Sequence, residues 1–212
     1  MRKPYHHGDL KNALIRAGAE VLVQEGVAGL TLRRVARRAG VSHSAPYAHF
    51  ADKEALVAAI STEGLRALRQ RIEEAVRSRD GDPGRQLQEA AWATVEFGLE
   101  QPDLYQVTFS SVIASEKDHP DYVDMAHGSF GALVELVRRG QAAGVVEPGP
   151  AEEVAVGFWS VTHGLVSLLG NRQIPHSLLA RTPPRKLLLA ALAPLLRGGR
   201  ASTRRGRGRR RS

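Results

Sequence analysis

The residues best suited to chemistry lie in one stretch, Thr31 to Phe50, and they favour binding of a polyanion. Two short predicted helices meet there at a glycine, which is the layout of a helix-turn-helix. The first of them carries four arginines, a positive charge that attracts a phosphate backbone. These are Arg33, Arg34, Arg37 and Arg38.

Three further residues fit this layout. Ala36 is small enough for the place where the two helices cross, and Gly40 can adopt the positive φ that the turn needs. Val41 follows as an apolar plug. Because a helical hairpin in any bundle can show these three residues, the surrounding residues must decide.

The surrounding residues resemble the DNA-binding domain of the TetR family of transcriptional regulators. The resemblance covers about residues 8–68, with 31–50 as the helix-turn-helix itself. It is carried by Leu30-Thr31, Ala39-Gly40-Val41-Ser42, Tyr47-x-His49-Phe50 and Asp52-Lys53-Glu54-Ala55-Leu56. It implies a three-helix N-terminal domain that binds double-stranded DNA, followed by a helical bundle that binds a ligand and dimerises.

The resemblance also implies a set of DNA contacts. Phosphates would be contacted by Thr31, Tyr47, His49 and Lys53, and the base edges would lie nearest His43, Ser44 and Ala45. Thr31 and Lys53 each begin a predicted helix, where free backbone N–H groups and the helix dipole favour a phosphate. His49 has a second interpretation, as a ring that helps to close the small core.

Pro46 departs from the family's pattern, in which an apolar residue other than proline is common. If Ser42 caps the recognition helix, Pro46 falls at the fourth helical position and deletes the first backbone bond. If Ser44 is the cap, Pro46 falls at the second position and costs little. We favour a start near Ser44. Alanine at 45 and 48 adds few hydrogen bonds, so base reading would also depend on methyl contacts and DNA shape.

The elements that position these residues are predicted to be helical nearly throughout, because apolar residues recur at spacings of three and four. In the N-terminal domain we expect a helix from Asp9 to Glu25 that stops at Gly26, and a second from 32 to 39 capped by Thr31. Asp52 would cap a third helix of about 27 residues. The expected helices of the second domain are 85–100, 103–115, 121–143, 151–170 and 184–197.

Charge is distributed unevenly over a chain of 212 residues with a formal net charge of +8. Residues 1–56 hold nine Lys/Arg against five Asp/Glu, and 57–197 hold fourteen against seventeen. The tail, 198–212, holds seven Arg and no acid, so we expect a disordered arm that binds polyanions non-specifically or merely aids solubility. A basic arm, 1–7, would either reach a minor groove or fray. The second domain is placed at 69–197.

The last two long segments, 151–170 and 184–197, are apolar on more than one face. Since a regulator of this class needs two copies on two half-sites, we expect them to form a four-helix interface in a homodimer. Burial inside one monomer is the alternative. Within the first segment, Trp159-x-x-x-His163-Gly164 resembles the Trp-x-x-x-His-Gly signature of one subgroup of TetR-like ligand domains.

His163 is open to two interpretations. It is a polar handle in an effector pocket, or a core histidine bonded to a backbone carbonyl. The pocket of the first interpretation would also be lined by Trp92, Phe97, Tyr105, Phe109, Phe130 and Trp159. Because few polar groups lie among these aromatic residues, the expected effector is a fairly apolar small molecule.

Several classes of protein find little support. Without cysteine there is no disulfide, thiolate nucleophile or cysteine-based metal site. No phosphate loop, nucleophile elbow or zinc-protease motif appears, and His119 and His127 are a poor metal pair, so we expect neither an enzyme nor a cofactor or metal. No signal peptide is visible and no window approaches the roughly 18 apolar residues of a membrane span, which predicts a cytoplasmic protein without a membrane partner.

The sequence therefore predicts a homodimeric, ligand-responsive DNA-binding regulator, most often a repressor in this family, that acts on a palindromic operator. One rival is a non-specific DNA-compacting protein dominated by the Arg-rich tail. A second rival is a helical enzyme whose N-terminal head is vestigial.

Overall fold

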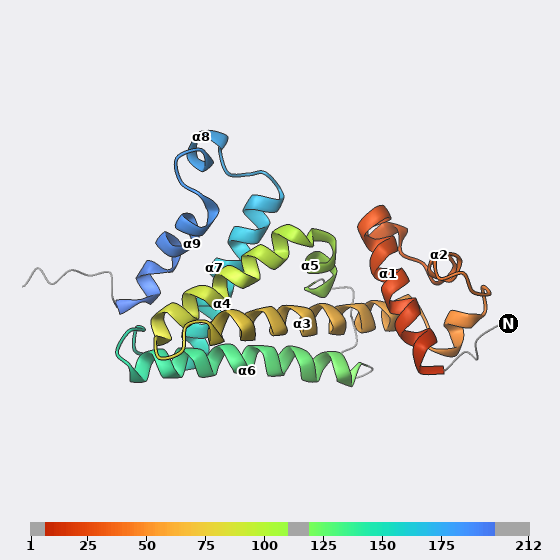
Figure 1. The fold of residues 1–212 in the computed structure, drawn as a ribbon, viewed down its shortest axis with the longest axis horizontal. Coiled ribbons are helices and arrows are strands. Elements are labelled where there is room, and N and C mark those ends of the chain that lie inside the picture. The colour runs from red at the N-terminus through yellow and green to blue at the C-terminus, as the bar shows by residue number, and fades with distance from the viewer. Residues whose placement is uncertain (1–6, 110–118, 198–212) are drawn as a thin grey trace, which may run out of the picture.

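The computed structural model describes residues 7–109 and 119–197, with side chains from residue 10 onward. Within these ranges the chain is helical, and its one backbone bridge joins Val146 to Leu196. The predicted all-α fold is confirmed. A small N-terminal head and a larger body share the long helix α3 (Lys53–Arg77), as Figure 1 shows. The predictions for the Arg-rich tail and for 1–6 of the basic arm concern residues outside the described ranges.

The head consists of α1 (His7–Gly29), α2 (Leu32–Arg38), the 3-10 helix η1 (Ala45–Ala48) and the first half of α3. Gly26, with a φ of 67°, interrupts α1 at the predicted stop. The side chains of one apolar core hold these elements together. Its buried members are Leu14, Ile15, Ala17, Val21, Leu22, Leu30, Leu32, Val35, Phe50, Leu56, Val57, Ile60 and Val107.

Two side-chain caps fix where the helices of the head begin. The hydroxyl of Thr31 accepts a hydrogen bond from the backbone N–H of Arg34 (3.2 Å), and the carboxylate of Asp52 accepts one from that of Ala55 (2.9 Å). Each cap satisfies one of the N–H groups that a helix start leaves without a partner. Both predicted caps are confirmed.

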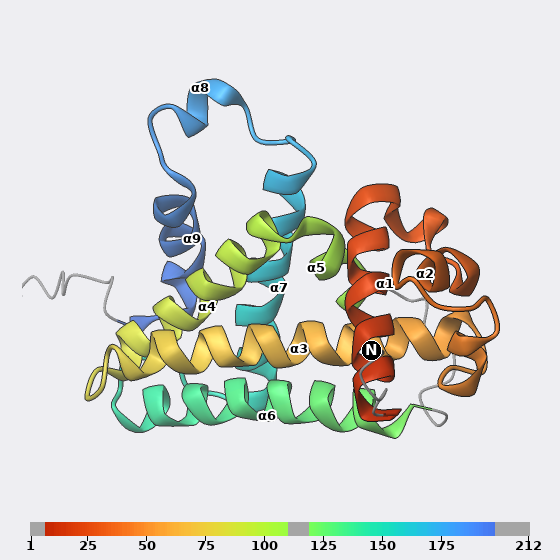
Figure 2. The ribbon, with the colours of Figure 1, turned by 45° about the vertical axis from the view of Figure 1, so that its right-hand side comes forward.

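The body contains α4 (Pro83–Glu100), α5 (Pro102–Thr108), α6 (Pro120–Ala142), α7 (Ala151–Gly170), α8 (His176–Leu179) and α9 (Pro184–Leu192). Proline starts four of these helices, a position where its missing N–H costs nothing. Figure 2 shows α3 between α4 and α6, with α7 crossing behind and α8 standing away from the rest.

The structure of the body differs from the prediction in three places. The helix predicted for 103–115 ends at Thr108, and 110–115 lie outside the described residues. The short helix α8 lies in a stretch predicted as a connection. The last segment leaves α9 at Leu192 and passes through a 3-10 turn, because Pro194 has no N–H to continue the α-helix. Leu196 is then extended and pairs with Val146.

Two helices belong to head and body at once. On α3, Leu56 and Ile60 lie in the core of the head and Leu68 in that of the body, so the boundary predicted at residue 68 falls inside one continuous helix. On α5, Val107 is buried in the core of the head, and its carbonyl accepts a hydrogen bond from Ser61 of α3 (3.2 Å). A Cβ at Gly64 would overlap Thr108, so glycine permits this close approach of α5 to α3.

The helix α7 is more apolar than expected. By length and composition alone it could cross a membrane, with a mean hydropathy of 1.2 over an 18-residue window. The prediction that no window approaches a membrane span is therefore wrong for this helix. It packs on α4, α6 and α9, yet only 28% of the window is buried within the chain.

Candidate functional site

The exposed face of the head is the first candidate site. Its turn follows α2, where Gly40 has a φ of 68° and the N–H of Val41 bonds to the carbonyl of Ala36 (3.0 Å). Ala36 is fully buried where the two helices cross. The three residues of the helix-turn-helix layout thus occupy their predicted places.

The second helix of the motif is short. It begins after Ser44, as favoured from the sequence, and is a four-residue 3-10 helix. Its bonds join residues three apart, from the N–H of Ala45 to the carbonyl of Ser42 (3.1 Å) and from that of Tyr47 to that of Ser44 (3.2 Å). Pro46, which is buried, cannot donate a bond to Ser42, and this removes the first α-helical link.

The residues predicted to read bases lie at the start of this short helix. His43 and Ser44 are exposed, and Ala45 is half-buried. The hydroxyls of Ser42 and Ser44 lie 3.2 Å apart, within hydrogen-bond distance. Polar groups near the N-terminal end of the element are thus open to a partner, while its small side chains leave room for close approach.

The four residues predicted to contact phosphates differ in how free they are. Tyr47 is exposed over 54% of its surface, and Thr31 is also exposed although its hydroxyl caps α2. The ammonium of Lys53 donates to the carbonyl of Val27 (2.9 Å), which leaves it further N–H groups. His49 is half-buried, and its ring centroid lies 6.5 Å from that of the adjacent Phe50, which is compatible with either interpretation.

The structure divides the four arginines of α2 into two pairs. Arg34 forms an ion pair with Glu25, and Arg38 forms one with Glu20 (2.6 Å), so both bind back to α1. Arg33 and Arg37 are exposed, and the described part of the chain gives them no ion pair. Their charge is the part of this patch that remains available to a partner.

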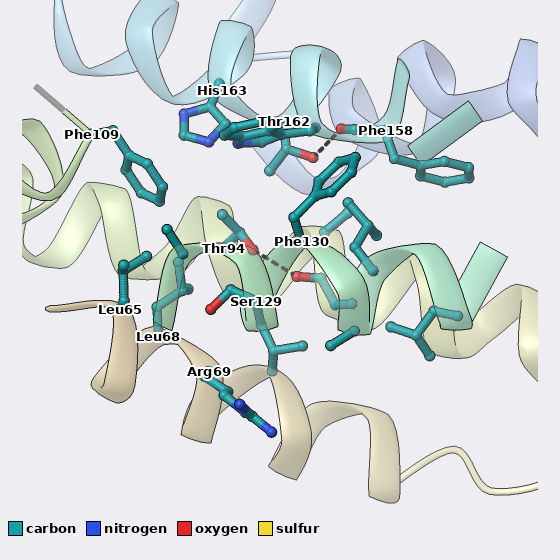
Figure 3. A pocket seen from close by; sticks show the side chains of 18 of the residues that line it. Leu65, Leu68, Arg69, Thr94, Phe109, Ser129, Phe130, Phe158, Thr162 and His163 are labelled. Carbon is teal, nitrogen blue, oxygen red and sulfur yellow. Dashed lines mark hydrogen bonds between the residues drawn. The ribbon is translucent and has the colours of Figure 1, made fainter. Parts of the chain in front are cut away.

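The second candidate site is a cavity of about 430 Å³ in the body, between α3, α4, α6 and α7 (Figure 3). Its volume lies within the range of small-molecule pockets. The residues that line it are mainly apolar. They are Leu65, Leu68, Arg69, Ile72, Glu73, Leu87, Ala90, Ala91, Thr94, Phe109, Tyr122, Ala126, Ser129, Phe130, Ala132, Leu133, Leu136, Phe158, Trp159, Thr162 and His163.

His163 lies at the wall of this cavity and bonds to a side chain. Its Nδ1 is 2.7 Å from the hydroxyl of Tyr105, and its buried Nε2 has no hydrogen-bond partner among the described residues. Burial lowers the pKa of His163 to about 4 and raises the pKa of the Tyr105 phenol above its usual range. The backbone carbonyl that one interpretation expected is replaced by the tyrosine hydroxyl.

Of the other predicted pocket residues, Phe109, Phe130 and Trp159 line the cavity and Tyr105 adjoins it through His163. Trp92 and Phe97 do not line it, and their predicted placement is corrected.

The physical reason differs between these two residues. Trp92 turns toward α9, where the guanidinium of Arg185 lies 5.7 Å from its ring. Phe97 is fully buried farther along α4 and packs on Tyr105, with ring centroids 6.4 Å apart. Successive residues on a helix face different directions, and aromatic character alone does not reveal which direction meets a cavity.

Sequence reasoning missed the polar residues of the cavity, chiefly Arg69, Thr94 and Ser129. Thr94 and Ser129 lie among apolar residues on the inner faces of α4 and α6. A hydroxyl within an apolar helical stripe was the available signal. Arg69 had no such signal, because its ion pair with Glu73 (2.8 Å) is typical of any exposed helix.

A helix-turn-helix head with free arginines, joined to a helical body that encloses an apolar cavity, defines a class of DNA-binding proteins. Residues 14–60 match the family described as bacterial regulatory proteins, tetR family, and 87–192 match the family described as tetracyclin repressor-like, C-terminal domain. The chain belongs to the tetR family. It is therefore a DNA-binding transcriptional regulator.

Individual relatives agree with this membership. The chain is 29% identical to the HTH-type transcriptional regulator YobS of Bacillus subtilis (strain 168) over 170 residues, 77% of this chain and 81% of that one. It is 46% identical to the Escherichia coli tetracycline repressor protein class A from transposon 1721 over 50 residues, 24% and 23% of the two chains. A solved protein with unknown function from Rhodococcus sp. RHA1 is 31% identical with a TM-score of 0.77, covering 91% of this chain and 96% of that one.

Proposed function

We propose that this regulator is a cytoplasmic repressor that binds a palindromic operator as a homodimer and releases it when a small apolar molecule enters the cavity. One observation carries the proposal. The walls of the cavity and the core of the head share the same helix, since α3 contributes Leu56 and Ile60 to the head and Leu65 and Leu68 to the cavity.

The DNA-contacting face of each head would combine phosphate contacts with a few base contacts. Thr31, Tyr47, His49 and Lys53 would hold phosphates, and His43, Ser44 and Ala45 would approach base edges. Arg33 and Arg37 add two charges that no acid neutralises within the described residues. A 3-10 element of four residues presents few side chains, so we expect operator choice to depend also on DNA shape.

Dimerisation would use the outer faces of α7 and α9. Along α7 the exposed residues Val156, Ser160, Gly164 and Leu168 recur every four positions, which places them on one stripe. A Cβ at Gly164 would meet nothing within 4 Å, so this point is open to another helix. An apolar helix that its own chain buries only in part is suited to a two-fold interface.

Ligand control would pass through α3 and α5. Tyr105 of α5 bonds to His163 at the cavity wall, while Val107 of the same short helix is buried in the core of the head. A ligand that alters the cavity would therefore act on α5, which also packs in the core of the head. It can change the spacing of the two heads only by its different affinity for the two spacings.

The experiment that tests the proposal is the selection of bound sequences from random duplexes by the full chain. We expect two inverted half-sites whose centres lie about one helical turn, or a multiple of it, apart. Failure to bind any duplex would favour the helical enzyme with a vestigial head.

A truncated chain, Met1–Gly199, separates the proposal from DNA compaction by the Arg-rich tail. We expect it to keep the site preference of the full chain while losing affinity at low salt. Loss of all preference on truncation would favour the rival.

A further inference from the structure

We infer that the cavity selects uncharged, largely apolar molecules that carry a carbonyl oxygen, and that this oxygen accepts a hydrogen bond from Nε2–H of His163. The inference rests on the proposed effector role of the cavity and adds the chemistry that the effector presents. Its basis is the position of the ring proton of His163 and the hydrogen bonds that the other polar groups of the cavity already make.

Tyr105 and His163 share one proton across their contact. A phenol is a better donor than a neutral imidazole N–H, and an imidazole nitrogen is a better acceptor than a phenol oxygen. Across the 2.7 Å contact the Tyr105 hydroxyl therefore donates to Nδ1. Burial keeps both side chains uncharged at neutral pH, since it lowers the pKa of His163 and raises that of Tyr105. The one ring proton of His163 consequently resides on Nε2.

The Nε2–H group of His163 lacks an acceptor among the described residues. It is buried, and a buried donor without an acceptor is costly. The ring is held in place by Phe109, edge-on at 4.4 Å between centroids, and by Trp159 at 5.3 Å. Figure 3 shows the ring at the cavity wall, above Phe109. Because Nε2 is fully covered in this structure, a ligand acceptor supplies the missing bond only when the side chains around Nε2 move aside.

The other polar residues of the cavity are Tyr122, whose hydroxyl donates to the carbonyl of Thr108 (3.4 Å), three further hydroxyl side chains and one ion pair. The hydroxyls of Thr94, Ser129 and Thr162 each donate to a carbonyl four residues earlier, at 3.0, 2.7 and 2.7 Å. They offer lone pairs to the cavity and no proton. Arg69 and Glu73 neutralise each other at exposed positions of α3. A charged group inside would lack a buried counter-ion, so the lining favours an uncharged ligand.

A matched set of four small probes tests the inference. The probes are 4-phenyl-2-butanone, n-butylbenzene, 4-phenylbutylamine and 4-phenylbutanoate, which share an aryl body and differ in the head group. Binding to the full chain is followed by calorimetry and by tryptophan fluorescence, since Trp159 lines the cavity. We expect the ratio of ketone to hydrocarbon affinity to be about fivefold higher in the wild type than in His163→Phe, the gain of one net hydrogen bond, and the two ions to bind more weakly than the ketone.

Variants separate the donor from the space that it fills. His163→Phe keeps an aromatic ring without a donor, so the ketone should bind about fivefold more weakly while butylbenzene binds as before. His163→Gln restores an N–H and should recover part of the preference. Tyr105→Phe should reduce the preference, because the ring proton is then free to move to Nδ1. The double variant Tyr105→Phe/His163→Phe leaves no orphaned hydroxyl and guards against loss of folding in the single variant.

Three results would overturn the inference. The first is the same ratio of ketone to hydrocarbon affinity in the wild type and in His163→Phe. The second is tightest binding by the amine or the carboxylate, or no binding by any probe. The third needs no ligand: nitrogen-15 NMR of the histidine rings should show the proton of His163 on Nε2, and a proton on Nδ1 contradicts the argument.

The DNA assay distinguishes this inference from the proposed function. If the ketone binds as expected but leaves the selected operator occupied, effector control fails while the selectivity of the cavity stands. If ligands of other chemistry release the operator and the ketone does not bind, the proposed function stands and the inference fails.

Discussion

The hydroxyl of Tyr105 lies 2.7 Å from Nδ1 of His163, and this contact ties α5 to α7 at the cavity wall. The same short helix buries Val107 in the core of the head. One polar pair in the body is thus two residues away from the packing of the DNA-binding domain. The neutral state of this pair has a measurable consequence for stability.

We expect the folded protein to become less stable as the pH is lowered, because of His163. Because burial lowers its pKa from 6.5 to about 4, the unfolded chain takes up a proton below pH 6.5 that the folded chain does not. His163 therefore has no effect on the free energy of unfolding above pH 6.5. Between pH 6.5 and about 4 it lowers this free energy progressively, by at most about 1.4 kcal/mol per pH unit. Urea unfolding across this range in the wild type and in His163→Gln measures the difference. Equal slopes in both proteins would contradict the assignment, because the other histidines cancel.

Arg37 and Arg38 provide a matched pair of charges on one helix. Arg37→Gln should weaken DNA binding and lower the salt slope by about one unit, because its charge is free for a phosphate. Arg38→Gln should change the slope less, since Glu20 already neutralises Arg38 at 2.6 Å. Binding titrations against salt concentration give both slopes. A larger effect from Arg38 would show that the ion pair opens on DNA.

The roles of Tyr47 and Lys53 are tested in the same way. Tyr47→Phe removes one hydroxyl and should weaken binding without a loss of stability, because the residue is 54% exposed. Lys53→Ala should flatten the salt slope and also cost some stability, since its ammonium bonds to the carbonyl of Val27 (2.9 Å). Binding isotherms with thermal unfolding separate the two effects. An unchanged salt slope in Lys53→Ala would argue against a phosphate contact.

Gly40 should be the more sensitive of two open glycines. Its φ is 68° and a Cβ there meets nothing, so Gly40→Ala should destabilise by about 1 kcal/mol through backbone strain alone. The matched control is Gly131→Ala, in the middle of α6 and equally open, which should stabilise by about 0.5–1 kcal/mol. Chemical denaturation compares them. Similar changes in stability at both positions would contradict this, because they would mean that the turn at Gly40 can adopt another backbone conformation without strain.

The proposed dimer is tested at another open glycine. Gly164→Arg places a charge on the exposed stripe of α7 and should produce monomers with much weaker operator binding. Gly131→Arg places the same charge on α6 and should leave the mass and the binding unchanged. Light scattering after size-exclusion chromatography reports the mass. A Gly164→Arg protein that remains dimeric would move the interface away from α7.

Local chemistry explains which elements were predictable. Thr31 and Asp52 cap their helices through bonds to residues three positions away, and Gly40 turns the chain by its own φ. Proline starts and the three- and four-residue periodicity act over similar distances. The prediction missed α8, a four-residue helix in a stretch expected to be a connection, and it extended the last helix past Leu192.

Side-chain direction and pairing were not predictable in the same way. The four arginines of α2 are alike in sequence, and only contact with acids 9 and 18 residues away divides them into bound and free. Trp92 and Trp159 are equally aromatic, yet only Trp159 meets the cavity.

The sequence by itself determined the all-α fold, the helix-turn-helix and the polar residues at its surface, because each depends on neighbours within a few residues. Tertiary structure alone decided the cavity, the free arginines and the partner of His163, which is 58 residues away in the sequence. Burial, and a hydrogen-bond partner so far away in the sequence, depend on how the helices pack against one another in the folded chain.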